Sequence, residues 1–248
     1  MISADHTPIL PPATLKDAHI TPEGYDTLYK QSMSDPNSFW ADVAKRLSWT
    51  KFPTIIKNTS FHSPVTIKWF EDGVLNASYN CIDRHLPHKK DDIALIWESD
   101  DPGIDAKISY GMLKDEVCRL ANGLKSRGVK KGDRVTIYMP MVAQAVYAML
   151  ACARIGAVHS VVFGGFSPQS LQDRIIDCQS DIIITADEGL RGGKKIPLKA
   201  NVDEALKNCP AVHTVVVFKR TGANVDWNSQ HDIWWHDLTS DQSTECAP

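Results

Sequence analysis

Long hydrophobic runs are absent from this sequence of 248 residues. No segment approaches the roughly 20 consecutive apolar residues that a transmembrane helix requires. The first residues, MISADH, contain neither the basic segment nor the apolar core of a secretory signal peptide. These absences predict a cytoplasmic protein that is not embedded in a membrane.

The sequence also has no large excess of charge of one sign. Its formal net charge of −3 gives no general attraction to nucleic acid or to anionic lipid. A site for a polyanion must therefore be a local basic patch on a mildly acidic chain. We expect small-molecule substrates as partners, and neither nucleic acid nor membrane.

Clustered cysteines are missing as well. The six cysteines are widely spaced and form no CxxC pair, so no disulfide framework is predicted. Cys81, His85 and His88 could share one face of a helix, but without a CxxC pair they do not complete a zinc site. We therefore predict no metal-binding residue. We also predict no catalytic residue, because no carboxylate pair or catalytic triad can be assembled from the sequence.

Two enzyme motifs come close to a match and fail. The phosphate-binding loop G-x-x-x-x-G-K-[ST] would need glycine and a hydroxyl residue where Glu188 and Lys195 stand. The nucleophile motif G-x-S-x-G begins at Gly165 but meets Gln169 in place of its second glycine. Ser167 is therefore predicted to cap a helix and not to act as a nucleophile.

The sequence does contain a regular alternation of strands and helices. Apolar strand segments recur at spacings of about 25–30 residues with helical segments between them, which is typical of parallel βαβ units. The VVVF and DIII runs show no polar alternation, as expected for central strands covered on both faces. The predicted fold is α/β, with a doubly wound, mainly parallel sheet. The predicted strands are residues 134–138, 158–163, 181–185 and 213–218, and the predicted helices between them are residues 142–155, 167–178 and 197–207.

A helical N-terminal extension is predicted before the sheet. Proline-rich residues 1–20 suggest an extended arm, and Thr21-Pro22 and Asp35-Pro36 each resemble the start of a helix. We divide the chain into an extension with packing helices over residues 1–90 and the first part of the α/β domain over residues 91–248. Further predicted elements are a strand at 66–70, a helix from Asn76 through His85, a hairpin with strands at 93–98 and 107–110, a helix capped by Ser109, and a short aromatic strand at 233–235.

The most informative segment is ADEGLRGGKKIPLK, which follows a predicted strand and precedes a predicted helix. It holds four cations, with no acid between Arg191 and Lys199. Ligands of open α/β sheets bind outside the carboxyl ends of the strands, where backbone N–H groups and a helix N-terminus face them. Gly192 and Gly193 would let the backbone approach a phosphate closely, and Arg191 and Lys194 would supply charge. The alternative is a basic loop that is merely solvated.

A second candidate segment is FGGFSP, which begins at Phe163 after the preceding strand. Gly164 and Gly165 could admit a flat ring or a phosphate, and Phe163 could stack on the ring. The alternative is a tight turn in front of a capped helix. We expect both candidate segments to open on the same edge of the sheet.

These segments together closely resemble the N-terminal portion of the acetate–CoA ligases (acetyl-coenzyme A synthetases), in the order found in that family. The resemblance runs from about Thr21 to Leu238. It is carried by NTSFHSPVTIKWFEDGVLNASYNCIDRHL, KKGDRVTIYMPMVAQAVYAMLACARIGAVHSVVFGGFSPQSLQDRIID, ADEGLRGGKKIPLK, KRTG and DIWWHDL.

The resemblance implies a member of the adenylate-forming (AMP-binding) superfamily. Such enzymes convert acetate and ATP, with Mg²⁺, to acetyl-AMP and pyrophosphate, and then transfer the acetyl group to coenzyme A. It implies that the sequence ends before the phosphate loop, the magnesium-binding acid and the catalytic lysine, so the chain without the rest of the protein should be inactive. ATP, Mg²⁺ and CoA are the expected cofactors of the full-length enzyme.

The resemblance places part of the CoA nucleotide site in this chain. Residues Arg191 through Lys194 match the positions that contact the phosphorylated adenosine end of CoA, and Phe163 through Gly165 match positions beside its adenine. Some members carry arginine at the position of Lys194. The lysine keeps the positive charge but cannot form the two-pronged contact of an arginine. Two alternatives stay open: a ligase for propionate or another short-chain acid, and a nucleotide-binding module without catalysis.

Overall fold

Capping residues followed by proline begin the first two helices, as the sequence predicts. The computed structural model describes residues 18–100 and 103–248. The Thr21 hydroxyl caps α1 (Pro22–Ser34) and the Asp35 carboxylate caps α2 (Pro36–Ala44), each accepting a backbone N–H at 3.1 Å. Proline suits the first turn because its missing N–H needs no partner there.

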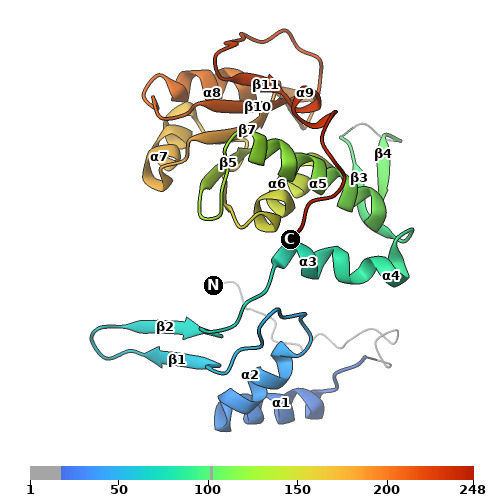
Figure 1. Ribbon diagram of the computed structural model, residues 1–248, viewed down its shortest axis with the longest axis vertical. Helices are drawn as coiled ribbons and strands as arrows, with labels where there is room; N and C mark the ends of the chain where they lie inside the picture. The colour runs from blue at the N-terminus through green and yellow to red at the C-terminus, as the bar shows by residue number, and fades with distance from the viewer. Residues whose placement is uncertain (1–17, 101–102) are drawn as a thin grey trace, which may run out of the picture. The chain divides into compact units, whose positions relative to one another are not determined.

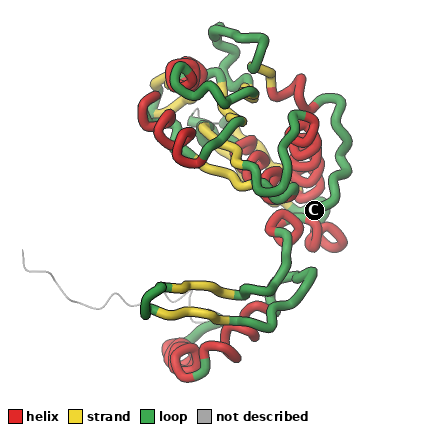
Figure 2. The backbone as a smooth tube through the Cα atoms, turned by 60° about the vertical axis from the view of Figure 1, so that its left-hand side comes forward, coloured by secondary structure: helices red, strands yellow, loops and turns green. Residues whose placement is uncertain are grey.

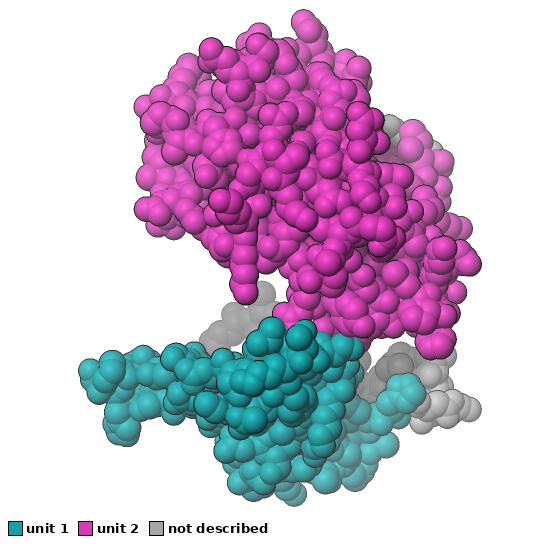
Figure 3. All heavy atoms as spheres, viewed as in Figure 1, with its two compact units in different colours: residues 1–74 teal, residues 75–248 magenta. Residues whose placement is uncertain are grey.

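The first of two compact units ends at Val74, and its described residues are 18–74 (Figure 3). After α1 and α2, this unit contains an antiparallel hairpin of β1 (Lys57–Ser60) and β2 (Thr66–Trp69). The strand predicted at 66–70 is confirmed, whereas its partner β1 was missed because KNTS shows no apolar alternation. Most of the predicted arm over residues 1–20 lies outside the described residues.

The second unit, residues 75–248, is built around a five-stranded parallel sheet with the strand order β11-β10-β7-β5-β6. Helices α5 and α6 pack together on one face, and α7 and α8 on the other (Figures 1 and 2). The predicted doubly wound α/β fold is therefore confirmed. The elements of this sheet and its helices are α5 (Tyr110–Ser126), β5 (Arg134–Tyr138), α6 (Ala143–Arg154), β6 (Val158–Val161), α7 (Pro168–Cys178), β7 (Ile182–Ala186), α8 (Leu198–Leu206), β10 (Thr214–Phe218), β11 (Asp232–Trp234) and α9 (Trp235–Thr239).

Short elements precede this sheet. The predicted hairpin is confirmed as antiparallel β3 and β4, but the helix predicted from Asn76 through His85 is broken at Ile82, whose φ of −122° and ψ of −71° leave the helical region. Ile82 is fully buried there. The short elements are α3 (Ala77–Cys81), the 3₁₀-helix η2 (Asp83–His85), α4 (Leu86–Lys89), β3 (Ile93–Glu98) and β4 (Asp105–Ser109).

No helix among the described residues is long and apolar enough to cross a bilayer.

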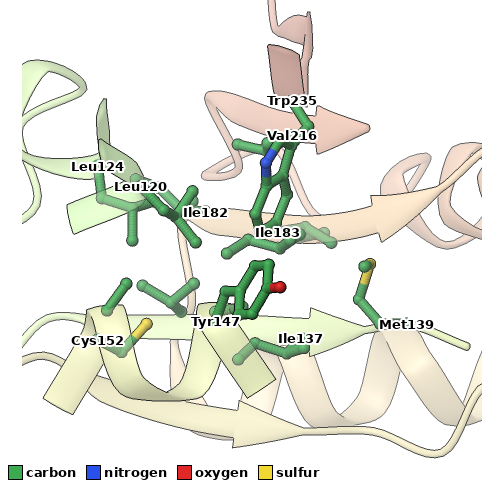
Figure 4. Close-up of a cluster of buried hydrophobic side chains, with 14 of the residues drawn as sticks. Leu120, Leu124, Ile137, Met139, Tyr147, Cys152, Ile182, Ile183, Val216 and Trp235 are labelled. Carbon is green, nitrogen blue, oxygen red and sulfur yellow. The ribbon is translucent and has the colours of Figure 1, made fainter. Parts of the chain in front are cut away.

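Among the described residues, the apolar core covers both faces of the sheet, with α5, α6 and α9 on one face and α7 and α8 on the other. Figure 4 shows Leu120 and Leu124 of α5 close to Ile182 of β7, with the rings of Tyr147 and Trp235 completing the cluster. All five residues of β7 are buried, which confirms the expectation from its uninterrupted apolar run. The core therefore fixes the central strands, and their carboxyl ends point at one edge.

A buried carboxylate joins two of those strand ends. Asp187 follows directly after β7 and is completely buried. It accepts hydrogen bonds from the four successive backbone N–H groups of residues 220–223, at 2.7–3.2 Å. Its own N–H donates to the carbonyl of Phe218 at 2.9 Å. The loop after β10 is thereby fastened to the end of β7.

Asp187→Asn is expected to lower the free energy of unfolding by about 2–4 kcal/mol, because hydrogen bonds to a charged group contribute ~1.5–3 kcal/mol each. The new amide NH₂ cannot accept the N–H groups that face it. Urea denaturation followed by tryptophan fluorescence measures the change. Asp181→Asn is the control: this residue at the other end of β7 is half-buried, and the substitution should cost less than about 0.5 kcal/mol. Equal losses in the two variants would contradict this role of Asp187.

Candidate functional site

The paired glycines form the turn of a β-hairpin. Strand β8 (Gly189–Arg191) pairs antiparallel with β9 (Lys194–Ile196), and Gly192 and Gly193 have φ values of 56° and 72°. A two-residue hairpin with positive φ at both turn positions matches the twist of its strands and strongly favours glycine. The sequence predicted one loop leading into a helix N-terminus. The structure corrects this, since β9 separates the turn from α8.

Two of the four cations in this segment are neutralised by acids. Lys199 is only 1% exposed and contacts the carboxylates of Asp203 and Asp232 at 2.6 and 2.9 Å. Lys195 pairs with Glu188 at 3.3 Å. The expected basic patch is therefore smaller than the sequence suggests, because Lys199 belongs to a buried ion-pair cluster and Lys195 to a surface ion pair.

The other two cations, Arg191 and Lys194, are exposed and oppose each other across the hairpin. Neither forms a salt bridge with another residue of the described ranges, 18–100 and 103–248. Like charges at directly opposed positions repel each other. A bound anion would relieve that repulsion.

The second candidate segment meets the hairpin at the same edge of the sheet, as expected. The Arg191 guanidinium lies over the Phe163 ring, 5.0 Å from its centroid. Phe166 packs edge-on against Phe163 at 5.8 Å and carries the guanidinium of Arg174 at 4.6 Å. Phe163 is 52% exposed, so part of its ring remains free for a ligand.

The glycines after Phe163 are required by close contacts. A Cβ on Gly165 would lie 2.6 Å from the Phe163 ring and 3.2 Å from Nη1 of Arg191, and one on Gly164 would lie 3.1 Å from the carbonyl oxygen of Met139. Real Cβ atoms rarely come this close to other atoms. The two glycines therefore leave the space in which the arginine and the aromatic ring meet.

Tyr138, the last residue of β5, is hydrogen-bonded to the turn formed by residues 163–166. Its hydroxyl donates to the carbonyl of Phe166 at 2.8 Å and accepts from the amide of Asn201 at 3.1 Å. Burial raises the pKa of the Tyr138 hydroxyl, an effect that the bond from Asn201 partly offsets. The hydroxyl therefore stays protonated and acts as a hydrogen-bond donor.

These segments line a cavity of about 550 Å³ at the carboxyl ends of β5, β6 and β7. The chain leaves β5 towards α6 on one face and leaves β7 towards α8 on the other, so the cavity lies at the position where ligands bind to doubly wound sheets. Its walls are mainly apolar, and the charged residues of its lining are Arg191 and Asp100. The lining includes Asp100, Met139, Met141, Phe163, Gly164, Gly165, Leu190 and Arg191.

Three residues of this region were not singled out from the sequence. Tyr138 and Asp187 carry a weak signal, since each places a polar group at the end of an otherwise apolar strand. Asp100 carries none, because its partner is far away in the chain: its carboxylate accepts the backbone N–H of Gly192 at 2.8 Å. Across the described ranges, 18–100 and 103–248, no group of three or more His, Cys, Asp or Glu side chains is placed to hold a metal ion.

Two family models match the chain in tandem. The model described as "Acetyl-coenzyme A synthetase N-terminus" matches residues 25–81, and the model described as "AMP-binding enzyme" matches residues 82–247. The chain is 61% identical over 235 residues to an acetyl-coenzyme A synthetase of Parvibaculum lavamentivorans, which covers 94% of this chain and 36% of the relative. An acetyl-coenzyme A synthetase of Saccharophagus degradans is 54% identical over 248 residues, covering 100% of this chain and 38% of the relative.

A solved structure shows the same fold. The acetoacetyl-CoA synthetase from Streptomyces lividans superposes with a TM-score of 0.79 at 25% sequence identity, covering 93% of this chain and 35% of that one. The chain thus spans 36–38% of the length of the two curated relatives named above. With one family model covering residues 82–247, the chain belongs to the AMP-binding enzyme family.

Proposed function

We propose that the full-length protein is an AMP-forming acetate–CoA ligase, and that this chain supplies part of its CoA nucleotide site. Such an enzyme joins acetate to ATP with Mg²⁺, releases pyrophosphate, and passes the acetyl group from acetyl-AMP to CoA. The tandem family matches and the high identity to acetyl-coenzyme A synthetases support this assignment.

The observation that carries the CoA proposal is the Arg191 guanidinium lying on the Phe163 ring at the rim of one cavity. The adenine of CoA would stack on the free part of this ring. The phosphate on the adenosine would be bound by Arg191 and Lys194, with Gly192 and Gly193 admitting it to the backbone. Gly164 and Gly165 would leave room for the base.

In this proposal the two parts of the chain have different tasks. Residues 1–90 form a packing extension, and residues 91–248 carry the contacts to CoA. ATP, Mg²⁺ and the acyl group would be held mainly by residues outside this chain, so the preference for acetate rests on the relatives. We further propose a cytoplasmic enzyme, in keeping with six cysteines that are all free thiols.

Arg191→Ala is expected to weaken the binding of CoA to the full-length protein about 10- to 100-fold, because a charge-assisted hydrogen bond contributes ~1.5–3 kcal/mol. The affinity of the variant for dephospho-CoA, which lacks the phosphate on the adenosine, should fall much less. Isothermal titration calorimetry with both ligands gives the ratio of the dissociation constants of dephospho-CoA and CoA. Arg174→Ala removes a similar arginine stacked on the neighbouring Phe166 and should leave the ratio unchanged. An unchanged ratio in Arg191→Ala would refute the phosphate role.

Gly165→Ala is expected to weaken the binding of both CoA and dephospho-CoA by about fivefold or more, since a ~1 kcal/mol loss corresponds to such a factor. The added methyl group forces the Phe163 ring, 2.6 Å away, out of its place and disturbs the adenine wall. It also lies 3.2 Å from Nη1 of Arg191, so CoA should lose at least as much affinity as dephospho-CoA. The same titrations give the result. Gly24→Ala in α1, where the methyl group has ordinary contacts of 3.4 Å or more, is the control. A selective loss of CoA alone would argue against a wall for adenine.

The 248-residue chain without the rest of the ligase is expected to show no acetate-dependent exchange between ATP and labelled pyrophosphate. The reason is that the proposal assigns ATP and acetate to other parts of the enzyme. The full-length protein, assayed in parallel, is the positive control. Exchange by this chain above the background without acetate would show that it contains the adenylation site.

A further inference from the structure

The end of strand β3 is fixed at the rim of the cavity by contacts to two other loops. The Trp97 indole N–H donates to the carbonyl of Met141 at 2.8 Å. The Arg220 guanidinium lies 5.1 Å from the centroid of the Trp97 ring and donates to the Ser99 hydroxyl at 3.3 Å. Residues 97–99 are thus held where the next residue, Asp100, reaches the β8–β9 hairpin.

Asp100 accepts a hydrogen bond from a backbone N–H group that could otherwise donate to a phosphate. Its carboxylate accepts the N–H of Gly192 at 2.8 Å. Gly192 is the first residue of the two-residue turn, outside the ladder that joins Arg191 to Lys194, so this N–H has no partner strand. Asp100 and Arg191 line the same cavity. A carboxylate therefore sits on the hairpin beside its two exposed cations.

We propose that Asp100 competes internally with phosphate at the β8–β9 turn and so sets how tightly the turn binds anions. The inference rests on the proposed CoA site, whose phosphate would meet the same turn. The Asp100 carboxylate holds the Gly192 N–H and repels any incoming anion. A simple anion gains too little to displace it, whereas a phosphorylated adenosine also gains the contact with Phe163.

Two effects of Asp100 can be separated by two substitutions. Asp100→Asn keeps an oxygen that can accept the Gly192 N–H but removes the charge, and Asp100→Ala removes both. Asp100 is exposed, so a dielectric constant between about 40 and that of water applies, and two unit charges about 6 Å apart then change affinity about three- to tenfold. Asp100→Asn should therefore bind phosphorylated adenosine about three- to tenfold more tightly, and Asp100→Ala at least as tightly as Asp100→Asn.

The test is calorimetric titration of the full-length protein with adenosine 3′,5′-bisphosphate, with adenosine, and with inorganic phosphate. Both Asp100 variants should bind the bisphosphate and inorganic phosphate more tightly than the wild type does, and should bind adenosine equally well. The increase in affinity should become smaller as the salt concentration is raised. Asp105→Asn is the matched control, because it removes an exposed acid from the same β3–β4 hairpin at the start of β4. It should bind all three ligands like the wild type.

The outcomes separate this proposal from the CoA site on which it rests. If the wild type prefers the bisphosphate to adenosine and Asp100→Asn shows the same or weaker affinity, the competitor role is wrong and the CoA site stands. A gain in Asp105→Asn as large as in Asp100→Asn also overturns it, since the effect would be net charge alone. If no variant prefers the bisphosphate to adenosine, both proposals fail.

Discussion

The geometry of the candidate site depends on one buried carboxylate, that of Asp187. Four successive backbone N–H groups converge on it, so the loop after β10 has a single low-energy position against the end of β7. That loop carries Arg220, whose guanidinium lies on Trp97 and contacts Ser99. Asp187 thus positions Arg220, and Arg220 helps to hold the end of β3. Asp100, which follows that strand, then contacts the β8–β9 turn at Gly192.

The site that results is a local cationic spot on a mildly acidic chain. Lys195 and Lys199 are committed to acids, and the fold leaves Arg191 and Lys194 opposed on a short hairpin above an apolar cavity. An aromatic ring beside two unneutralised cations fits a ligand that has both a flat base and a phosphate. If Asp100 competes as proposed, the hairpin binds anions weakly unless the ligand also contacts Phe163.

Local rules account for most of what the sequence could predict. Caps at Thr21, Asp35 and Ser167, and apolar runs such as those of β7 and β10, depend on neighbouring residues only. Strands β5, β6, β7 and β10 and the helices between them were therefore predicted close to their observed bounds. The meeting of the two glycine-containing segments was also predictable, because the loops after parallel strands share one edge of a sheet.

Contacts between distant residues set the limit of prediction. The turn at Gly192 and Gly193 was expected to lead into a helix, because the short strands β8 and β9 have no apolar run of their own. Lys199 was counted among the cations of the patch, although Asp203, four residues later on α8, is one of its partners; its second partner, Asp232, belongs to a strand far along the chain. The contact of Asp100 with the turn depends in the same way on how β3 is anchored.

A crystal structure of the full-length protein with bound CoA tests the central claim most directly. The account predicts the adenine against the Phe163 ring and an oxygen of the adenosine phosphate within hydrogen-bond distance of the Arg191 guanidinium. A nucleotide bound at the opposite, amino edge of the sheet, with Arg191 still in solvent, would contradict it.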